Sequence, residues 1–338
     1  MKYVLSSLLA TATLVFAAPS FAQSIPIKFT LDWAAQGPHS WFYLAEERGY
    51  FDEEGLDVTI DQGEGSAAAV SRVTTGAYDA GFGDINALIQ AAATAPDDAP
   101  VMVYLIYNRA PFAIISKKDG PVQQLADLEG KIVASPAGSA TFRLFPALAE
   151  ANGFDSSTVE TLNADQNLIE QLLVRGDAEA IAQFGATSYM NFMAMGEKPE
   201  EDYNWFFYSD NGVDLYSNGV IVSRALIEDH PEAVTGLVRA INRAVMDVVA
   251  DPQAGIAVLT AIEPLTDSAI ETQRLQYMID NQLRTAETAK LGLGDLSMDR
   301  LAVSIDTVVK AYELTTKPDA AAIFDPSFLP PLEERQLP

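Results

Sequence analysis

The chain has 338 residues, 49% of them hydrophobic, which is enough for a sizeable core or for two lobes. Its formal net charge of −26 repels phosphate backbones and anionic lipid, so the composition argues against binding to nucleic acid or to a membrane surface. The absence of cysteine excludes disulfides, thiol catalysis and cysteine-ligated metal.

The first 22 residues have the pattern of a secretory signal peptide. Lys2 precedes an apolar run, and residues 19–22 read PSFA, with small residues at the last and third-last positions. The run is shorter than the roughly 20 residues that a membrane-spanning helix needs. We therefore expect cleavage after Ala22 and a soluble protein in the periplasm, with no membrane insertion and no lipid anchor.

The remaining chain alternates strands with helices. Periodicity predicts strands at residues 25–32, 56–62, 79–82, 101–107, 113–116, 131–135, 159–162, 178–183 and 218–223. Helices are predicted between them at residues 41–48, 67–75, 84–93, 140–152 and 166–175, and beyond residue 225 the chain is helical until an irregular, proline-rich segment at residues 319–331. This order predicts an α/β protein with two parallel-type lobes and a central cleft.

Ligands in such sheets bind beyond the carboxyl ends of the strands, where loops enter helices. The first such loop holds Trp33, Gln36 and His39. Trp33 is either a platform on which a flat ligand stacks or a core residue. His39, one of only two histidines, either contacts the ligand or packs behind Trp33.

The helix after this loop begins with three consecutive aromatic residues, Trp41, Phe42 and Tyr43. One face of a helix cannot bury three neighbours in sequence, so we expect one or two of these rings to face the cleft.

A glycine-rich turn, residues 63–66, follows the second predicted strand. Glycine lets the backbone approach a ligand, and Gly65 and Ser66 either contact the solute or form an ordinary turn in which Ser66 caps the next helix. Glu64 would suit an amine on the ligand and oppose an anion. The turn is not a phosphate-binding loop, because it lacks that motif's spacing and its lysine.

Further candidates come from later strand ends. Ser139 is expected to cap the helix after residue 138, and Arg143 either grips an anionic group or pairs with a surface carboxylate. Asp84 is expected to cap a helix, with ligand contact as the second interpretation. The candidate ligand contacts from the remaining loops are Tyr107, Asn108, Gln183 and Tyr189.

Signatures of catalysis are scarce. The chain has no GxSxG elbow and no HExxH motif, and two histidines without cysteine cannot build a histidine-rich metal site. We expect no enzymatic activity, no metal and no cofactor.

Three stretches carry a resemblance to a known family. They are "LDW" followed by a histidine and a helix ending in "RGYFDEEGLDV", then "GEGSAAAVSRVTTGAYDAGFGDINALI", then "LADLEGKIVASPAGSATFRLFPALAEANGFD". The chain resembles the binding proteins of ABC importers related to yeast thiamine-pyrimidine synthase, from about residue 25 to about residue 312. The resemblance implies a type II-like periplasmic binding protein with two crossover strands. It also implies a discontinuous first lobe, residues 23–110 and 215–338, around a second lobe, residues 111–214.

The resemblance also implies a ligand. Relatives that bind pyrimidines stack them on aromatics and hold their amines with acids and amides; Trp33, His39 and the turn at Gly65 match their pattern. Where those relatives commonly carry a proline and two asparagines, this chain has Ala35, Gln36 and Pro38. The yeast-type enzymes use a cysteine-rich motif and a lysine-linked cofactor. This chain contains no cysteine and therefore lacks the motif.

We therefore predict the periplasmic solute-binding component of an ABC importer, a monomer that delivers a small nitrogen-bearing aromatic solute, such as a thiamine pyrimidine precursor, to a permease. A receptor for taurine, an alkanesulfonate, nitrate or a similar small anion is the alternative. A secreted enzyme or a ligand-sensing module on the same scaffold is the alternative from another class.

Overall fold

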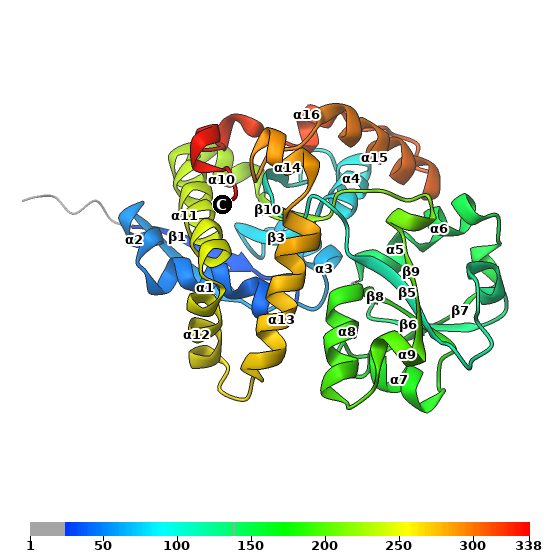
Figure 1. Cartoon of the computed structure of the whole chain (residues 1–338). Coiled ribbons are helices and arrows are strands. Elements are labelled where there is room, and N and C mark those ends of the chain that lie inside the picture. The colour runs from blue at the N-terminus through cyan, green and yellow to red at the C-terminus, as the bar shows by residue number, and fades with distance from the viewer. Residues whose placement is uncertain (1–23, 138) are drawn as a thin grey trace, which may run out of the picture.

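The computed structural model describes residues 24–137 and 139–338, so the predicted signal peptide, residues 1–22, lies outside the described residues. The fold is a two-lobed α/β structure in which each lobe is built on one five-stranded sheet flanked by helices (Figure 1). The strand order is β2-β1-β3-β10-β4 in the first sheet and β7-β6-β8-β5-β9 in the second.

The first lobe contains both ends of the described chain. Its strands are β1 (Ile25–Thr30), β2 (Leu56–Asp61), β3 (Ala80–Asp84), β4 (Val101–Leu105) and β10 (Asn218–Val222). Its early helices are α1 (Ser40–Glu47), α2 (Tyr50–Glu53), α3 (Ser66–Thr74) and α4 (Ile85–Thr94). The helices after β10 are α10 (Arg224–Asp229), α11 (Pro231–Ala250), α12 (Pro252–Ile262), α13 (Ser268–Met278), α14 (Ala286–Leu291), α15 (Met298–Ala311) and α16 (Ala320–Ile323).

The second lobe lies between β4 and β10 in sequence. Its strands are β5 (Phe112–Lys117), β6 (Ile132–Ser135), β7 (Glu160–Asn163), β8 (Ala180–Phe184) and β9 (Tyr203–Phe207). Its helices are α5 (Ala140–Arg143), α6 (Phe145–Asn152), α7 (Ile169–Arg175), α8 (Gly185–Ala194) and α9 (Pro199–Asp202).

The sheets are mixed rather than parallel throughout. Strands β1, β2 and β3 pair in parallel, as do β6, β7 and β8, whereas β10 runs antiparallel to β3 and β4, and β5 runs antiparallel to β8 and β9. Strands β5 and β10 each follow a crossing of the chain from one lobe to the other. Each starts at the cleft edge, where its parallel neighbours end: Asn218 pairs with Asp84, and Phe112 pairs with Phe184.

The two crossings are the segments 106–111 and 208–217. They are tied to each other by backbone hydrogen bonds, from Ala110 N–H to the Leu215 carbonyl (3.1 Å) and from Ser217 N–H to the Tyr107 carbonyl (3.1 Å). Two short segments joined in this way allow the lobes to rotate about one axis. We propose lobe boundaries near residues 110 and 215, within these segments.

One helical prediction needs correction, and two elements were not predicted. The helix predicted at residues 140–152 is broken at Leu144 into α5 and α6, because Pro146 in the first turn of α6 has no N–H for the preceding turn. Helix α8 and the edge strand β9 were not predicted; the aromatic run of β9 lacks the alternation typical of a half-buried strand.

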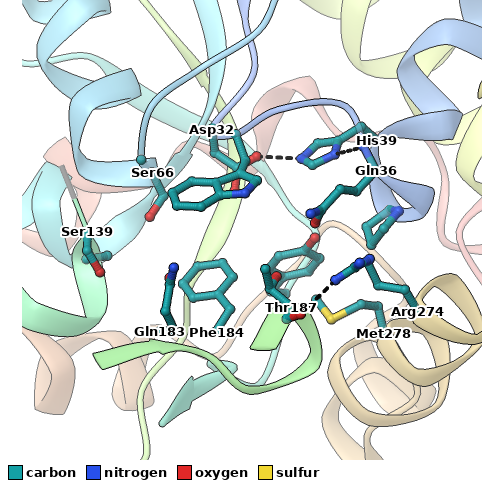
Figure 2. A pocket seen from close by; sticks show the side chains of 15 residues that line it. Asp32, Gln36, His39, Ser66, Ser139, Gln183, Phe184, Thr187, Arg274 and Met278 are labelled. Carbon is teal, nitrogen blue, oxygen red and sulfur yellow. Dashed lines mark hydrogen bonds and ion pairs between the residues drawn. The ribbon is translucent and has the colours of Figure 1, made fainter. Parts of the chain in front are cut away.

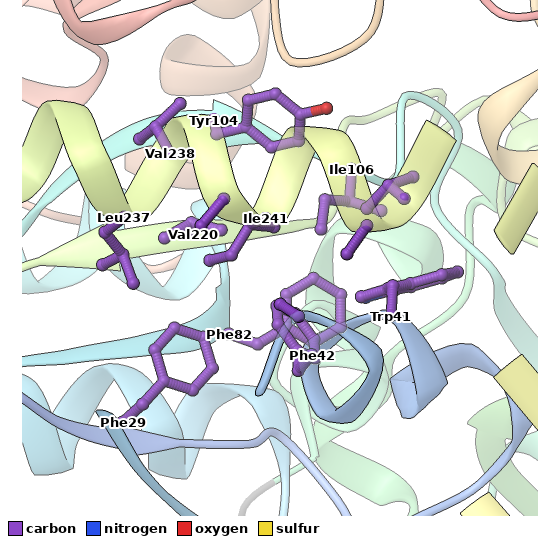
Figure 3. Packing of buried hydrophobic residues seen from close by; sticks show 14 of the residues in the cluster. Phe29, Trp41, Phe42, Phe82, Tyr104, Ile106, Val220, Leu237, Val238 and Ile241 are labelled. Carbon is purple, nitrogen blue, oxygen red and sulfur yellow. The ribbon is translucent and has the colours of Figure 1, made fainter. Parts of the chain in front are cut away.

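The expectation that one or two rings of Trp41, Phe42 and Tyr43 face the cleft is wrong, because all three are buried. Helix α1 is covered on one side by the sheet and on the other by α11 and α12. Figure 3 shows Phe42 in this core; its ring centroid lies 5.0 Å from that of Phe29 and 5.2 Å from that of Phe82. Burial on all sides fixes α1, and with it the loop that enters the helix.

Within the described ranges, no single helix is both long and apolar enough to cross a membrane, although the bent pair α11 and α12 passes that test by length and composition.

Candidate ligand-binding site

A cavity lies between the two lobes, at the carboxyl ends of β1 and β8 (Figure 2). It encloses about 500 Å³ of empty space, its open mouth included. The lining residues come from both lobes and from α13: Asp32, Trp33, Gln36, Pro38, His39, Gly65, Ser66, Tyr107, Ser139, Ala140, Gln183, Phe184, Thr187, Arg274 and Met278.

Eight of the thirteen candidate residues line this cavity. They are Trp33, Gln36, His39, Gly65, Ser66, Tyr107, Ser139 and Gln183. The sequence identified them because each lies where a strand gives way to a loop or helix. Two of the eight, Ser139 and Ser66, were also considered as helix caps. Ser139 caps α5 by accepting the Phe142 N–H, as predicted. At α3, Gly65 rather than Ser66 occupies the N-cap position.

The other five candidates lie outside the cavity. Glu64 is exposed, 3.8 Å from a guanidinium nitrogen of Arg72, and Arg143 donates to Gln90 at 3.4 Å. Tyr189 donates to Glu200 at 3.0 Å.

The last two of these five, Asp84 and Asn108, are buried in the first lobe. Asp84 accepts the backbone N–H groups of Asn86 and Ala87 at 3.0 and 2.9 Å, as its predicted capping role requires. Burial is the largest cause that raises the pKa of Asp84 to about 6, against hydrogen bonds that lower it. The side-chain oxygen of Asn108, which lies within the crossing segment 106–111, accepts from Thr285 at 2.8 Å.

His39 lines the cavity, but both of its ring nitrogens are bound to protein. The backbone N–H of Gln36 donates to Nδ1 at 2.9 Å, so the ring proton sits on Nε2 and is donated to Asp32 Oδ1 at 2.7 Å (Figure 2). The ring therefore presents carbon atoms to the cavity. Its role in this geometry is to hold the binding loop, residues 32–39, and to orient the carboxylate of Asp32.

Asp32 is the principal group that the sequence analysis missed. The predicted strand ran to residue 32, but β1 ends at Thr30, which leaves Asp32 in the binding loop with only 4% of its surface exposed. Its Oδ2 accepts from Asn218 Nδ2 at 2.7 Å, so each carboxylate oxygen already has one donor. The signal that could have revealed it is an acidic residue between a buried strand and an aromatic, as in "LDW".

Arg274 and Met278 were also missed, because they belong to α13, more than 230 residues from the first loop. The charge of Arg274 is neutralised within its own helix: its Nε lies 2.9 Å from Glu271 Oε2, and one terminal nitrogen lies 3.0 Å from Glu271 Oε1. Both side chains are buried. Arg274 is therefore not a free cation for an anionic solute.

The rest of the cavity wall is largely aromatic and apolar, with the rings of Trp33, Tyr107 and Phe184 and the thioether of Met278. Gln183, only 3% exposed, has a side-chain nitrogen with no hydrogen-bond partner among the described residues. Figure 2 shows its amide directed into the space below Ser66. A ligand that reaches this amide would satisfy it.

Among the residues that the structure describes, no three His, Asp or Glu side chains cluster in a way that could hold a metal ion.

The sequence model described as "NMT1/THI5 like" matches residues 36–255, more than half of the chain. Riboflavin-binding protein RibY of Chloroflexus aurantiacus is 26% identical over 301 residues, covering 86% of this chain and 82% of that protein. The formylaminopyrimidine-binding protein of Halalkalibacterium halodurans is 27% identical and covers 69% of each chain. The 4-amino-5-hydroxymethyl-2-methylpyrimidine phosphate synthase of Aspergillus parasiticus is 23% identical and covers 72% of each.

Among solved structures, the alkanesulfonate-binding protein SsuA of Xanthomonas axonopodis pv. citri, bound to MOPS, superposes with a TM-score of 0.70 at 15% identity. The superposition covers 90% of this chain and 99% of SsuA, and at this identity it shows a shared fold only.

Proposed function

Because the chain belongs to the NMT1/THI5-like family, we propose that it is the solute-binding component of an ABC importer. Its solute is a small, flat, nitrogen-bearing aromatic molecule without a negative charge, such as a pyrimidine precursor of thiamine. The solute binds between the two lobes and is presented to a permease. We further propose export through residues 1–22, a periplasmic location and a monomeric state.

The observation that carries this proposal is the balance of charge in the cavity. The charged groups that line it are Asp32 and Arg274, and Arg274 is paired with Glu271 just behind the wall. Within the described part of the chain, the carboxylate of Asp32 has two neutral donors, His39 and Asn218, but no cation. A sulfonate or nitrate would be buried beside this carboxylate without a free positive group, which is costly, whereas an amine or a protonated ring nitrogen would be attracted to it.

The shape of the cavity supports an aromatic solute. Flat rings gain stacking and area burial from walls such as Trp33 and Phe184. The names of two relatives, which bind riboflavin and a formylaminopyrimidine, both denote nitrogen heteroaromatics. We infer the same chemical class for this chain.

An anion remains the second candidate because of two helix ends. Helices α3 and α8 begin at the cavity, next to Gly65 and Phe184, and neither has a side-chain cap, although the first N–H of α8, that of Gly185, donates to the Pro111 carbonyl at 2.8 Å. Free N–H groups at a helix N-terminus attract negative charge or a neutral acceptor such as a carbonyl oxygen. A heterocycle with a carbonyl or a formyl group would use the same donors without opposing Asp32.

Catalysis is not part of the proposal, although one relative is named as a synthase. Among the residues that the structure describes, the wall of the cavity contains no cysteine or lysine, and both ring nitrogens of His39 are occupied. A general base or nucleophile would need a free reactive atom facing the solute.

The test is a thermal-shift screen of residues 23–338. The panel sets 4-amino-5-hydroxymethyl-2-methylpyrimidine, its formylaminopyrimidine analogue and riboflavin against taurine, an alkanesulfonate and nitrate. A ligand that binds only the folded state raises the melting temperature with its concentration. We expect the shift with a nitrogen heteroaromatic. A shift with sulfonates alone, or with no member of the panel, would reject the proposed solute class.

A further inference from the structure

A buried arginine of the first lobe is hydrogen-bonded to the second lobe beside the cavity. Helices α13 and α8 lie side by side across the lobe boundary (Figure 1). From α13, one terminal nitrogen of Arg274 donates to the backbone carbonyl of Thr187 at 3.0 Å, and the other donates to the side-chain oxygen of Asn191 at 3.2 Å. Both acceptors belong to α8.

The same arginine is tied to the binding loop through its ion-pair partner. Glu271 Oε2 accepts a hydrogen bond from Arg274 Nε at 2.9 Å and another from the backbone N–H of Gly37 at 2.6 Å. The fit at Gly37 is close, because an added Cβ would lie 2.4 Å from the backbone oxygen of Glu271. One carboxylate therefore holds the loop on one side and the guanidinium on the other.

Helix α8 is also anchored within the second lobe. Ser188, the residue next to Thr187, donates to the buried carboxylate of Glu170 at 2.7 Å. The guanidinium of Arg274 thus bonds to Glu271 of the first lobe and to Thr187 and Asn191 of the second. Its planar set of five donors allows it to serve both at once.

We propose that Glu271, Arg274 and Asn191 form an interlobe clasp that couples the binding loop to α8. Arg274 acts as a positioning residue: it holds the walls of the two lobes at their closed spacing and does not select the solute by charge. Opening the lobes separates Arg274 from Thr187 and Asn191 and leaves the Glu271 pair in place. The clasp therefore stabilises the closed arrangement in the absence of solute, through contacts that exist only when the lobes meet.

A purely local ion pair within α13 is the simpler alternative, since Glu271 and Arg274 are three residues apart on one helix. Asn191 separates the two explanations. It belongs to the other lobe, so its removal leaves the ion pair of α13 intact, and only an interlobe clasp predicts an effect on lobe spacing.

The experiment measures the distance between the lobes directly. The chain has no cysteine, so Leu265→Cys in the first lobe and Met195→Cys in the second, both at exposed positions, give a unique pair of spin-label sites. Pulsed dipolar spectroscopy of the solute-free protein then reports the fractions of closed and open molecules. The measurement compares the labelled parent with Asn191→Ala, Arg274→Met and Arg274→Lys. The matched control is Arg284→Ala, which removes an exposed ion pair with Asp280 just beyond α13.

We expect a short-distance population in the parent. Its ratio to the open population should fall about tenfold in Asn191→Ala and in Arg274→Met, the size expected for charge-assisted hydrogen bonds, and should recover in part in Arg274→Lys. Arg284→Ala should match the parent. Circular dichroism checks that each variant is folded, and Asn191→Ala decides the matter if Arg274→Met does not fold.

Two results would overturn the proposal. The first is a parent protein that shows no short-distance population. The second is a distance distribution that stays the same as the parent's in Asn191→Ala and in Arg274→Met, if the latter folds. Because no solute is used, either result is independent of the solute class proposed above.

Discussion

His39 and Asp32 are joined by a 2.7 Å hydrogen bond from Nε2 to Oδ1, and the backbone N–H of Gln36 fixes the tautomer that makes this bond possible. The histidine is thus a support for the acid rather than a ligand group in its own right. A receptor that holds one carboxylate in this way, with Asn218 on its other oxygen, presents a fixed acceptor to a solute that carries a donor.

The first prediction follows from this acceptor. In Asp32→Asn, the negative charge is lost while the size of the side chain is kept. We expect the affinity for the heteroaromatic that gives the shift in the screen to fall about tenfold or more, since hydrogen bonds to a charged group are worth about 1.5–3 kcal/mol. Isothermal titration calorimetry measures the change. Glu64→Gln is the matched control, because it removes an equal charge that the structure places outside the cavity; an equal loss in both variants would contradict the assignment of Asp32.

The second prediction concerns the aromatic wall. Trp33→Ala should weaken binding of the same solute about tenfold or more without a large loss of stability, because Trp33 lines the cavity and is not part of the fully buried core. Trp205→Ala is the comparison, since Trp205 packs on Tyr189 away from the cavity. Calorimetry and urea unfolding separate the two effects. Unchanged affinity in Trp33→Ala would mean that the ring is only packing.

Much of the fold was predictable from local patterns. The spacing of apolar residues identified β1 to β8 and β10. The rule that ligands bind beyond the carboxyl ends of strands identified Trp33, Ser66 and Gln183 as residues of the cavity. Such patterns report which residues are buried and which turn, and these are short-range properties.

The remainder depends on contacts that a local pattern does not contain. Asp32 is a buried charge whose partner Asn218 lies far along the chain, and the Glu271–Arg274 pair lies equally far from Gly37, which donates to Glu271. The direction of β5 and β10 likewise depends on which lobe the chain has just left. Tertiary geometry, rather than propensity, decides these features.

The third prediction tests how the binding loop is held. A Cβ on Gly63 would lie 2.1 Å from the Leu31 carbonyl oxygen, and the Gly63 N–H also donates to the Trp33 carbonyl at 3.0 Å. We expect Gly63→Ala to reduce the free energy of unfolding by about 2 kcal/mol or more, because rigid backbone must move. Gly76→Ala adds a methyl group in open space at a left-handed φ of +71° and should cost only about 1 kcal/mol. Urea unfolding gives both values, and an equal or smaller loss in Gly63→Ala would contradict the close approach.

The fourth prediction concerns the pH dependence of stability. Burial raises the pKa of Asp84 from 3.8 to about 6, so the folded protein binds this proton more tightly than the unfolded chain does. The contribution of Asp84 to stability is therefore fully present below pH 3.8 and is lost as the pH rises through 6.

Asp84→Asn removes this titration and keeps an oxygen that can cap α4. Between pH 5 and pH 7.5, above the pI of 4.2, the stability of the wild type should fall by about 1 kcal/mol relative to that of Asp84→Asn. Urea unfolding at both pH values measures the difference. Parallel pH profiles for the two proteins would show that Asp84 has an ordinary pKa, and the hydrogen bonds from Asn86, Ala87 and Ser217 would then have to outweigh its burial.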